Sequence, residues 1–536
     1  MMIKNILKDN LLSLLAMLLL LLIFFGKFLL GETRFLFGFN DFYMFNYPHA
    51  VFLKNSIIDG ELPRWNPYIL SGSPFSVNIF STFGLSIFLF PLSFLPDISM
   101  FIVLAIALLG MYVFLVESVQ VNRTAAVIGG ITFTFSGFFM NWLHQEYTIG
   151  GIVFLPWNLY LLDKALSRKS ILFAIAAGIS ISLALMNGIS QMFVYNLMAV
   201  AAFFIFRTFP LLKHGRKEAL TSSFLFLLIL GIGFCLSGIY VLPYLEVLQL
   251  SQRPDLTYAQ VTDTHGHGQW GSVPLRNLIT YIIPDFFGSP VDKNLLRGAY
   301  IEKISYLGIL PFMLAVIALF SEKNRYTYFF FGLAIFSLLM ASGTPIYALF
   351  YYAVPILAKA RSIVRIHILI NFSIAVLAAI GAHNLMEGKI NRKTILLICW
   401  GFMFAFAAGF LIFFDKIVEK PKYQFLLQFI VWINALSAIG FYALRHIPDR
   451  DKGIPWRGSY FPYLCIGAFF LLSAITVYCD LFLNMIVWRD YALEVDPKYA
   501  HKLSAILKEA DISQWSSQWN LLYVYLAVGN PAREVF

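Results

Sequence analysis

Apolar runs dominate the chain and recur along almost its whole length. A helix needs about 17–25 apolar residues to cross a bilayer, and we assign thirteen such spans between residues 11 and 481. They cover residues 11–31, 99–116, 124–141, 149–163, 171–186, 191–206, 221–241, 304–320, 327–341, 364–386, 394–414, 424–444 and 460–481. The pattern predicts an all-α polytopic membrane protein.

The distribution of basic residues predicts how the spans are oriented. A further apolar stretch, 79–96, is interrupted by Gly84, Pro91 and Pro96, and we expect it not to cross. Seven short segments between spans then hold about half of the 39 Lys and Arg residues, and such segments face the cytoplasm. These are residues 1–10, 117–123, 164–170, 207–220, 321–326, 387–393 and 445–459. The N-terminus is therefore predicted to be cytoplasmic.

Composition excludes a water-soluble protein. The chain of 536 residues is 59% apolar and only 13% charged, whereas soluble domains are about 45–50% apolar and about 25% charged. The net charge of +10 is explained by the basic cytoplasmic segments, so it gives no reason to expect a nucleic-acid partner. The four cysteines lie in or beside apolar segments without metal-type spacing, which is typical of small core residues.

Three longer segments fall on the predicted outer face, at residues 32–98, 242–303 and 342–363. They are aromatic-rich, punctuated by proline and without an obvious periodic pattern, and long connections of this kind are usually functional. Any chemistry is therefore expected outside the cytoplasm. We divide the chain into one transmembrane domain, residues 1–481, and an outer tail, residues 482–536, which is either short or the start of a larger domain.

The first outer segment carries a candidate acid. Asp41 precedes a stretch, residues 42–58, whose apolar positions suit an amphipathic helix on the membrane surface. Residues 62–67 and 71–74 are turn-forming, with Trp65 as an interfacial aromatic. On position alone, Asp41 is better explained as a solvated loop residue.

Several short motifs follow one another in order along residues 30–390. They are Asp41, Tyr47-Pro48, Gly60 to Pro67, Gly72-Ser73-Pro74, Asn187 to Gln191, Leu242-Pro243 through Arg253, Pro284 to Gly288, Tyr300-Ile301-Glu302 with Tyr306-Leu307-Gly308, and Ala360-Arg361 with Arg365. In combination they resemble the bacterial YfhO-type membrane proteins, a branch of the GT-C glycosyltransferases. Asn187 to Gln191 stands where that family commonly has Gly-His-Pro-Gln, so the family's histidine is missing here.

The resemblance implies a GT-C-like fold in the bacterial inner membrane. It also implies transfer of a sugar from a polyprenyl-phosphate donor to an extracytoplasmic acceptor such as a cell-envelope glycopolymer or lipid. Asp41 would be the catalytic base, because it lies beside the first span at the membrane surface. Arg361 and Arg365, four residues apart, would bind the donor phosphate, and Arg253 is a third candidate. Each arginine is equally explained as an interfacial anchor of a span.

Three further residues are candidates for substrate contacts. Glu302 aligns with a recurrent acid of the family and would bind sugar hydroxyls or a divalent cation, although pairing with the neighbouring Lys303 explains it as well. His144 and Glu146 lie in a very short outer turn and would line the cavity, or form a polar cluster at a helix end. No cofactor or metal is otherwise expected.

Two metal- or nucleotide-like patterns are discounted. Asp263, His265 and His267 lie in a glycine-rich segment, and Asp449-Arg450-Asp451 lies in a short predicted cytoplasmic loop.

The alternative functions are a transporter or flippase of lipid-linked sugars and a structural assembly protein. Transporters commonly show internal repeats and broken helices, and the sequence predicts neither.

Overall fold

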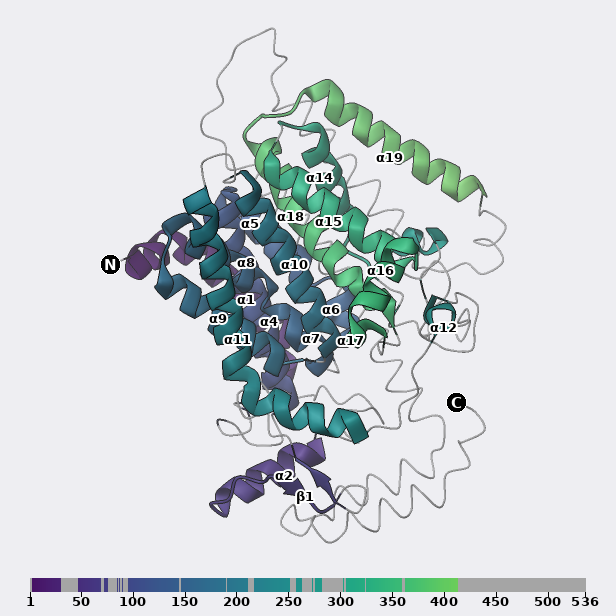
Figure 1. Cartoon of the computed structure of the whole chain (residues 1–536). Helices are drawn as coiled ribbons and strands as arrows, with labels where there is room; N and C mark the ends of the chain where they lie inside the picture. Colours follow the sequence, from purple (N-terminus) through teal and green to yellow (C-terminus); the bar gives the residue numbers. More distant parts are fainter. Residues whose placement is uncertain are drawn as a thin grey trace.

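The computed structural model describes most of the first three quarters of the chain (Figure 1). The described residues are 2–29, 47–68, 72–75, 84, 86, 89, 95–143, 146–188, 190–210, 216–250, 257–262, 272, 275–281, 302, 305–322, 324–358 and 362–412. The predicted spans 424–444 and 460–481, the outer tail and most of 79–96 lie outside them. So do the Asp263, His265 and His267 pattern and Asp449-Arg450-Asp451.

The described part is built almost entirely of helices. In chain order they are α1 (Met2–Leu29), α2 (Tyr47–Ile58), α4 (Leu95–Phe114), α5 (Arg123–Thr134), α6 (Gly137–Trp142), α7 (Glu146–Val153), α8 (Leu155–Arg168), α9 (Ile171–Met186), α10 (Ser190–Thr208), α11 (Arg216–Leu250), α12 (Tyr258–Thr262), α14 (Ile309–Phe320), α15 (Arg325–Ala341), α16 (Pro345–Ala353), α17 (Pro355–Ala358), α18 (His367–Met386) and α19 (Arg392–Ile412). A π-helical turn, η3 (Leu115–Val119), extends α4, and 3-10 turns η5 (Leu275–Tyr281) and η6 (Ile363–Ile366) precede α14 and α18. Strands β1 (Trp65–Asn66) and β2 (Ser73–Pro74) form an antiparallel pair.

Several described helices are long and apolar enough to cross a membrane. Four qualify, at Ile98–Val119, Gln191–Thr208, Arg216–Glu246 and Ile363–Met386, and the bent pair α15 and α16 gives a fifth. Four shorter apolar helices accompany them. A polytopic all-α membrane architecture is therefore supported, whereas the predicted total of thirteen spans is not confirmed.

Two predicted spans are broken. The span expected at 124–141 is divided between α5 and α6, because Ser136 takes an extended conformation before α6. Gly137 N–H then donates to the Tyr306 carbonyl at 2.6 Å instead of to its own helix. The span expected at 149–163 is divided into α7 and α8 at Phe154, and Pro156 stands in the first turn of α8.

The outer segments are more helical than predicted. Helix α11 continues through Pro243 to Leu250, past the end expected at residue 241, although proline removes one backbone donor from the helix. Residues expected to be irregular also form α12, α16 and α17.

The expectation that no helix is broken is also wrong, because α15 and α16 meet at an angle of 81°. The bend follows Gly343, which has a φ of +66°.

Helix α18 forms the centre of the described core. Its span, Ile363–Met386, is 94% buried, while that of α11 is 22% buried at the periphery. Helix α14 approaches α18 closely at Gly381, where a Cβ atom would lie 1.8 Å from the Leu314 carbonyl oxygen. Phe372 of α18 packs against Phe114, Phe133 and Phe330 of three other helices. These contacts fix the position of the N-terminal end of α18.

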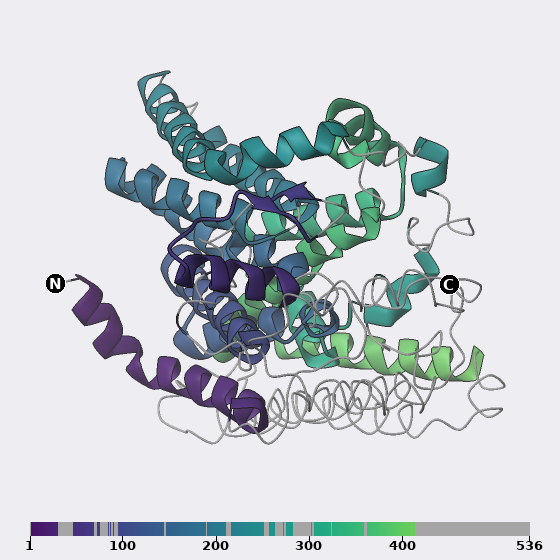
Figure 2. The same ribbon diagram turned by 90° about the horizontal axis from the view of Figure 1, so that it is seen from below.

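Residues of four segments predicted to be cytoplasmic, 117–123, 164–170, 207–220 and 321–326, contact one another or the end of α18. Ion pairs join Glu117 to Lys164 at 3.0 Å and Lys169 to Glu218 at 3.0 Å, and a hydrogen bond of 2.6 Å joins Asn384 to Ser321. Helix α2 and the β1–β2 pair lie across the opposite end, which faces the viewer in Figure 2. These contacts lie at the end of the bundle away from α2, and which end faces the cytoplasm remains a prediction.

Candidate functional site

Helix α2 and the strand pair form an aromatic layer at the predicted outer end. The His49 and Phe75 rings stack with centroids 5.4 Å apart, and Phe52 meets the Phe75 ring edge-on at 5.1 Å. The Trp65 ring lies over Gly72, whose φ of +110° and lack of a side chain both suit the turn. A helix and a turn were expected here, and both are present. Contact of α2 with the membrane surface remains a prediction.

The best-defined polar group of the described residues is an ion pair between Glu302 and Arg365. Arg365 donates from Nε to both carboxylate oxygens of Glu302 at 3.0 Å and from Nη2 to Oε1 at 2.5 Å. The Glu302 side chain is 1% exposed and that of Arg365 is 16% exposed. The structure places Arg365, 63 residues later, against Glu302. Lys303, the partner that the sequence suggested, lies outside the described residues.

A second layer of hydrogen bonds fixes this pair. Ser362 Oγ donates to Glu302 Oε2 at 2.8 Å, and the Ser362 carbonyl accepts from Gln191 Nε2. The same Gln191 nitrogen lies 2.9 Å from the hydroxyl of Tyr195, one turn further along α10. Gln191 thus ties the start of α10 to the backbone immediately before η6, which carries Arg365.

Trp142 covers one side of the arginine. Its ring lies 4.7 Å from the guanidinium carbon of Arg365 at the end of α6, a cation–π contact. Arg365 donates to Glu302 from Nε and Nη2. Among the described residues, its Nη1 has no hydrogen-bond partner. The guanidinium is thus held on two sides and retains donor capacity for an anion.

A buried serine and histidine lie three and two residues after Glu302 and Arg365 in the sequence. Ser305 Oγ is 3.2 Å from Nδ1 of His367, at the start of α18, and both side chains are buried. The Tyr281 ring lies 5.5 Å from the His367 ring. Burial raises the pKa of the Tyr281 hydroxyl, which therefore stays protonated. Ser305, His367 and Tyr281 thus form a second buried polar group, of which Ser305 and His367 are close in sequence to the ion pair.

The structure brings together only part of the predicted site. Glu302 and Arg365 are in direct contact. Asp41, Arg253, Arg361 and His144 lie outside the described residues, and Glu146 begins α7 with a side chain that is also outside them. Their roles stay predictions.

Three residues of the cluster carried no predicted role: Gln191, Ser362 and Trp142. Gln191 belongs to the motif at 187–191 and Ser362 lies between the two candidate arginines, so proximity to a motif was the available signal. Trp142 had none beyond its position two residues before His144.

Among the described residues no group of three or more His, Cys, Asp or Glu side chains is placed to hold a metal ion. Glu302 has both carboxylate oxygens engaged by Arg365 and Ser362. What the cluster offers chemically is a fixed, partly buried cation at the end of several helices, suited to an anionic group such as a phosphate.

Comparisons with known proteins find similarity among solved structures. No protein-family model matches the chain, and no curated protein matches its sequence. Among solved structures, the chain is similar to ArnT from Cupriavidus metallidurans, determined bound to undecaprenyl phosphate. The alignment covers 83% of this chain and 72% of that chain at 10% identity, with a TM-score of 0.37. A similarity of this size does not establish a common fold.

Proposed function

We propose that the chain is a membrane glycosyltransferase that moves a sugar from a polyprenyl-phosphate donor to an extracytoplasmic acceptor. One observation carries the proposal. Three motifs of the resemblance to the YfhO-type family, at residues 187–191, 300–308 and 360–365, lie far apart in the sequence, and Gln191, Glu302, Ser362 and Arg365 from these motifs form one hydrogen-bonded cluster. Residues that serve only as anchors of separate spans are not expected to form one hydrogen-bonded cluster.

Arg365 is assigned to the donor phosphate. When the bond between the sugar and the phosphate breaks, the electron pair leaves with the phosphate oxygen, so a nearby cation stabilises the leaving group. A guanidinium stays charged at any physiological pH and binds phosphate oxygens through several N–H groups. Glu302 and Trp142 hold this guanidinium in place, and Arg361 and Arg253 are proposed to complete the phosphate site.

Asp41 is assigned as the base. The acceptor hydroxyl attacks the anomeric carbon, a new glycosidic bond forms, the bond to phosphate breaks, and the hydroxyl proton passes to Asp41. The donor reacts at the membrane surface, so a base on the segment between α1 and α2 is suitably placed in the sequence. His144 and Glu146 are proposed to contact the sugar or the acceptor.

The test uses purified protein with a polyprenyl-phosphate sugar. Asp41→Asn should lower turnover by at least about a hundredfold with donor binding retained. Asp59→Asn, an exposed acid just after α2, is the matched control and should be fully active. Arg365→Lys should raise the donor KM, because lysine cannot reproduce the guanidinium fork.

The outcomes separate the assignments. If Asp41→Asn is active and Glu302→Gln, although folded, is inactive, the base is Glu302 and the transferase survives with a different catalytic residue. If both variants are active, neither Asp41 nor Glu302 is the base. If the parent protein transfers no sugar, the enzyme proposal is wrong.

A flippase of lipid-linked sugars is the second candidate, and the bent pair α15 and α16 is the observation that favours it. Broken helices are common in transporters, where they surround a site near the membrane midplane. Here the break, at Ser342 to Thr344, lies at the predicted outer end of a span. Movement of a fluorescent polyprenyl-phosphate sugar across vesicles without any sugar transfer would establish this second function.

A further inference from the structure

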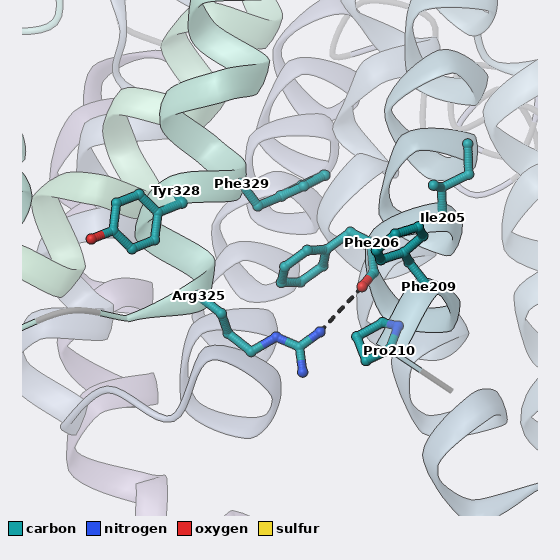
Figure 3. Close-up of a pocket in the computed structure, with 7 residues that line it drawn as sticks. All are labelled: Ile205, Phe206, Phe209, Pro210, Arg325, Tyr328 and Phe329. Atoms are coloured by element: carbon teal, nitrogen blue, oxygen red, sulfur yellow. Dashed lines mark hydrogen bonds between the residues drawn. The ribbon is translucent and has the colours of Figure 1, made fainter. Parts of the chain in front are cut away.

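A groove at the end of the bundle opposite to Glu302 is lined by apolar side chains and one arginine. It lies between the C-terminal end of α10 and the N-terminal end of α15 (Figure 3). Its lining residues are Ile205, Phe206, Phe209, Pro210, Arg325, Tyr328 and Phe329, and its volume is about 550 Å³. None of these residues has a part in the proposed transferase site.

The apolar wall of the groove belongs to two candidate membrane spans. These are Gln191–Thr208 and the bent pair that begins at Arg325. Ile205, Phe209 and Tyr328 are 62%, 66% and 58% exposed. Exposed apolar side chains on a membrane span contact acyl chains, so a lipid is the natural occupant of this wall.

The floor of the groove is rigid. Phe206 and Phe329 stack with ring centroids 4.6 Å apart, and Phe203 packs against both rings. Arg325 lies over the Phe206 ring at 4.5 Å, and its Nη2 donates to the Phe206 carbonyl at 3.1 Å. That carbonyl is in the last turn of α10, where helices have unpaired acceptors. The arginine is therefore fixed at the rim of an apolar surface.

The fixed guanidinium retains unused donors. Among the described residues, Arg325 Nε and Nη1 have no hydrogen-bond partner, and no carboxylate pairs with this arginine. The neighbouring Arg207 differs, because it is paired with Asp163 at 2.7 Å. Arg325 is thus an exposed cation at the end of two spans, at the level of the lipid headgroups, beside a groove for acyl chains.

We propose that this groove is a binding site for an anionic phospholipid, with the phosphate on Arg325 and an acyl chain along Phe209 and Ile205. Basic pockets between transmembrane helices on the cytoplasmic side bind anionic headgroups. The charge pattern places this end in the cytoplasmic leaflet. The site is separate from the donor site, and the proposal does not depend on the transferase activity.

The experiment measures lipid binding directly. Purified full-length protein is stripped of lipid in detergent and titrated with phosphatidylglycerol or with phosphatidylcholine of the same acyl chains, and bound lipid is counted by native mass spectrometry. We expect the protein to bind phosphatidylglycerol more tightly. Arg325→Gln should weaken that binding about tenfold, or about 1.4 kcal/mol, while binding of phosphatidylcholine stays the same.

Arg168→Gln is the matched control. Arg168 is also near the predicted cytoplasmic end and also lies over a ring, that of Phe173 at 5.3 Å, but it does not line the groove. This variant should bind phosphatidylglycerol like the parent protein. Equal affinity of the parent for the two lipids, or unchanged binding in Arg325→Gln, would overturn the proposal.

A second variant covers the case in which Arg325→Gln does not fold, since Arg325 also pairs with the end of α10. Phe209→Ala keeps the arginine and removes only an exposed ring from the groove wall. It should weaken phosphatidylglycerol binding through lost acyl contact. If it binds this lipid as tightly as the parent protein does, the groove is not the site.

Discussion

Replacing Glu302 by glutamine tests whether the buried ion pair organises the predicted outer end of the bundle. The change keeps the size of the side chain and removes its charge. The carboxylate accepts from Arg365 at three short contacts and from Ser362 at 2.8 Å. Glutamine can accept through only one oxygen, and its own NH₂ group would face the donors of Arg365.

The expected loss of stability follows from the burial of the Glu302 carboxylate, whose side chain is 1% exposed. Removing one member of a buried ion pair leaves the other charge uncompensated and costs about 3–5 kcal/mol. Arg365 is 16% exposed and keeps its cation–π contact with Trp142, so some compensation remains. We therefore expect Glu302→Gln to lower the free energy of unfolding by about 3 kcal/mol, at the lower end of that range.

The assay is an SDS titration in mixed micelles, followed by tryptophan fluorescence, with a double-mutant cycle. Because Arg365→Gln removes the stranded charge, the double variant Glu302→Gln/Arg365→Gln should be no less stable than Glu302→Gln alone. Glu218→Gln is the control. It breaks the ion pair between Glu218 and Lys169, whose side chains are 37% and 56% exposed, respectively. This change should lower the free energy of unfolding by less than about 1 kcal/mol. Equal costs for Glu302→Gln and Glu218→Gln would refute the reasoning.

Three further outcomes are expected. Gly381→Ala should destabilise the protein by at least about 1–3 kcal/mol in the same titration, because the new methyl group would meet the Leu314 carbonyl, whereas Gly332→Ala, with nothing within 4 Å, should be neutral or slightly stabilising. Gly72→Ala should make the segment between α2 and α4 sensitive to limited proteolysis, because Gly72 has a φ of +110° and the Trp65 ring occupies the place of an added methyl group. Equal proteolysis of the parent protein and the variant would contradict this. A reporter fused after residue 144 should give an extracytoplasmic signal, and a cytoplasmic signal would refute the topology.

Hydropathy predicts individual helices well where one apolar run forms one helix. Residues 171–186 were expected as a span and form α9 with the same bounds. The same method joined α5 to α6, because the break at Ser136 depends on a hydrogen bond from Gly137 to Tyr306, about 170 residues away. Hydropathy contains no information about such a distant acceptor.

The candidate site shows a similar division. The motifs selected Glu302 and Arg365 individually, but nothing in their spacing indicated that they bind each other. Adjacency suggested Lys303, which lies outside the described residues, as a partner of Glu302. The contact with Arg365 depends on how α18 packs between other helices, which spacing along the chain does not encode. Ser362 and Trp142 were missed for the same reason, since their roles arise from tertiary contacts.

The burial of α18 also constrains how the protein is made. The helix that is most enclosed in the described core leaves the ribosome after α5, α14 and α15, against which it packs. Glu302 is synthesised 63 residues before Arg365, so the nascent chain holds this carboxylate before its arginine partner exists. Membrane insertion of α18 then brings the arginine to the acid. Assembly of the candidate site therefore has to wait for a helix that is synthesised after the helices that enclose it.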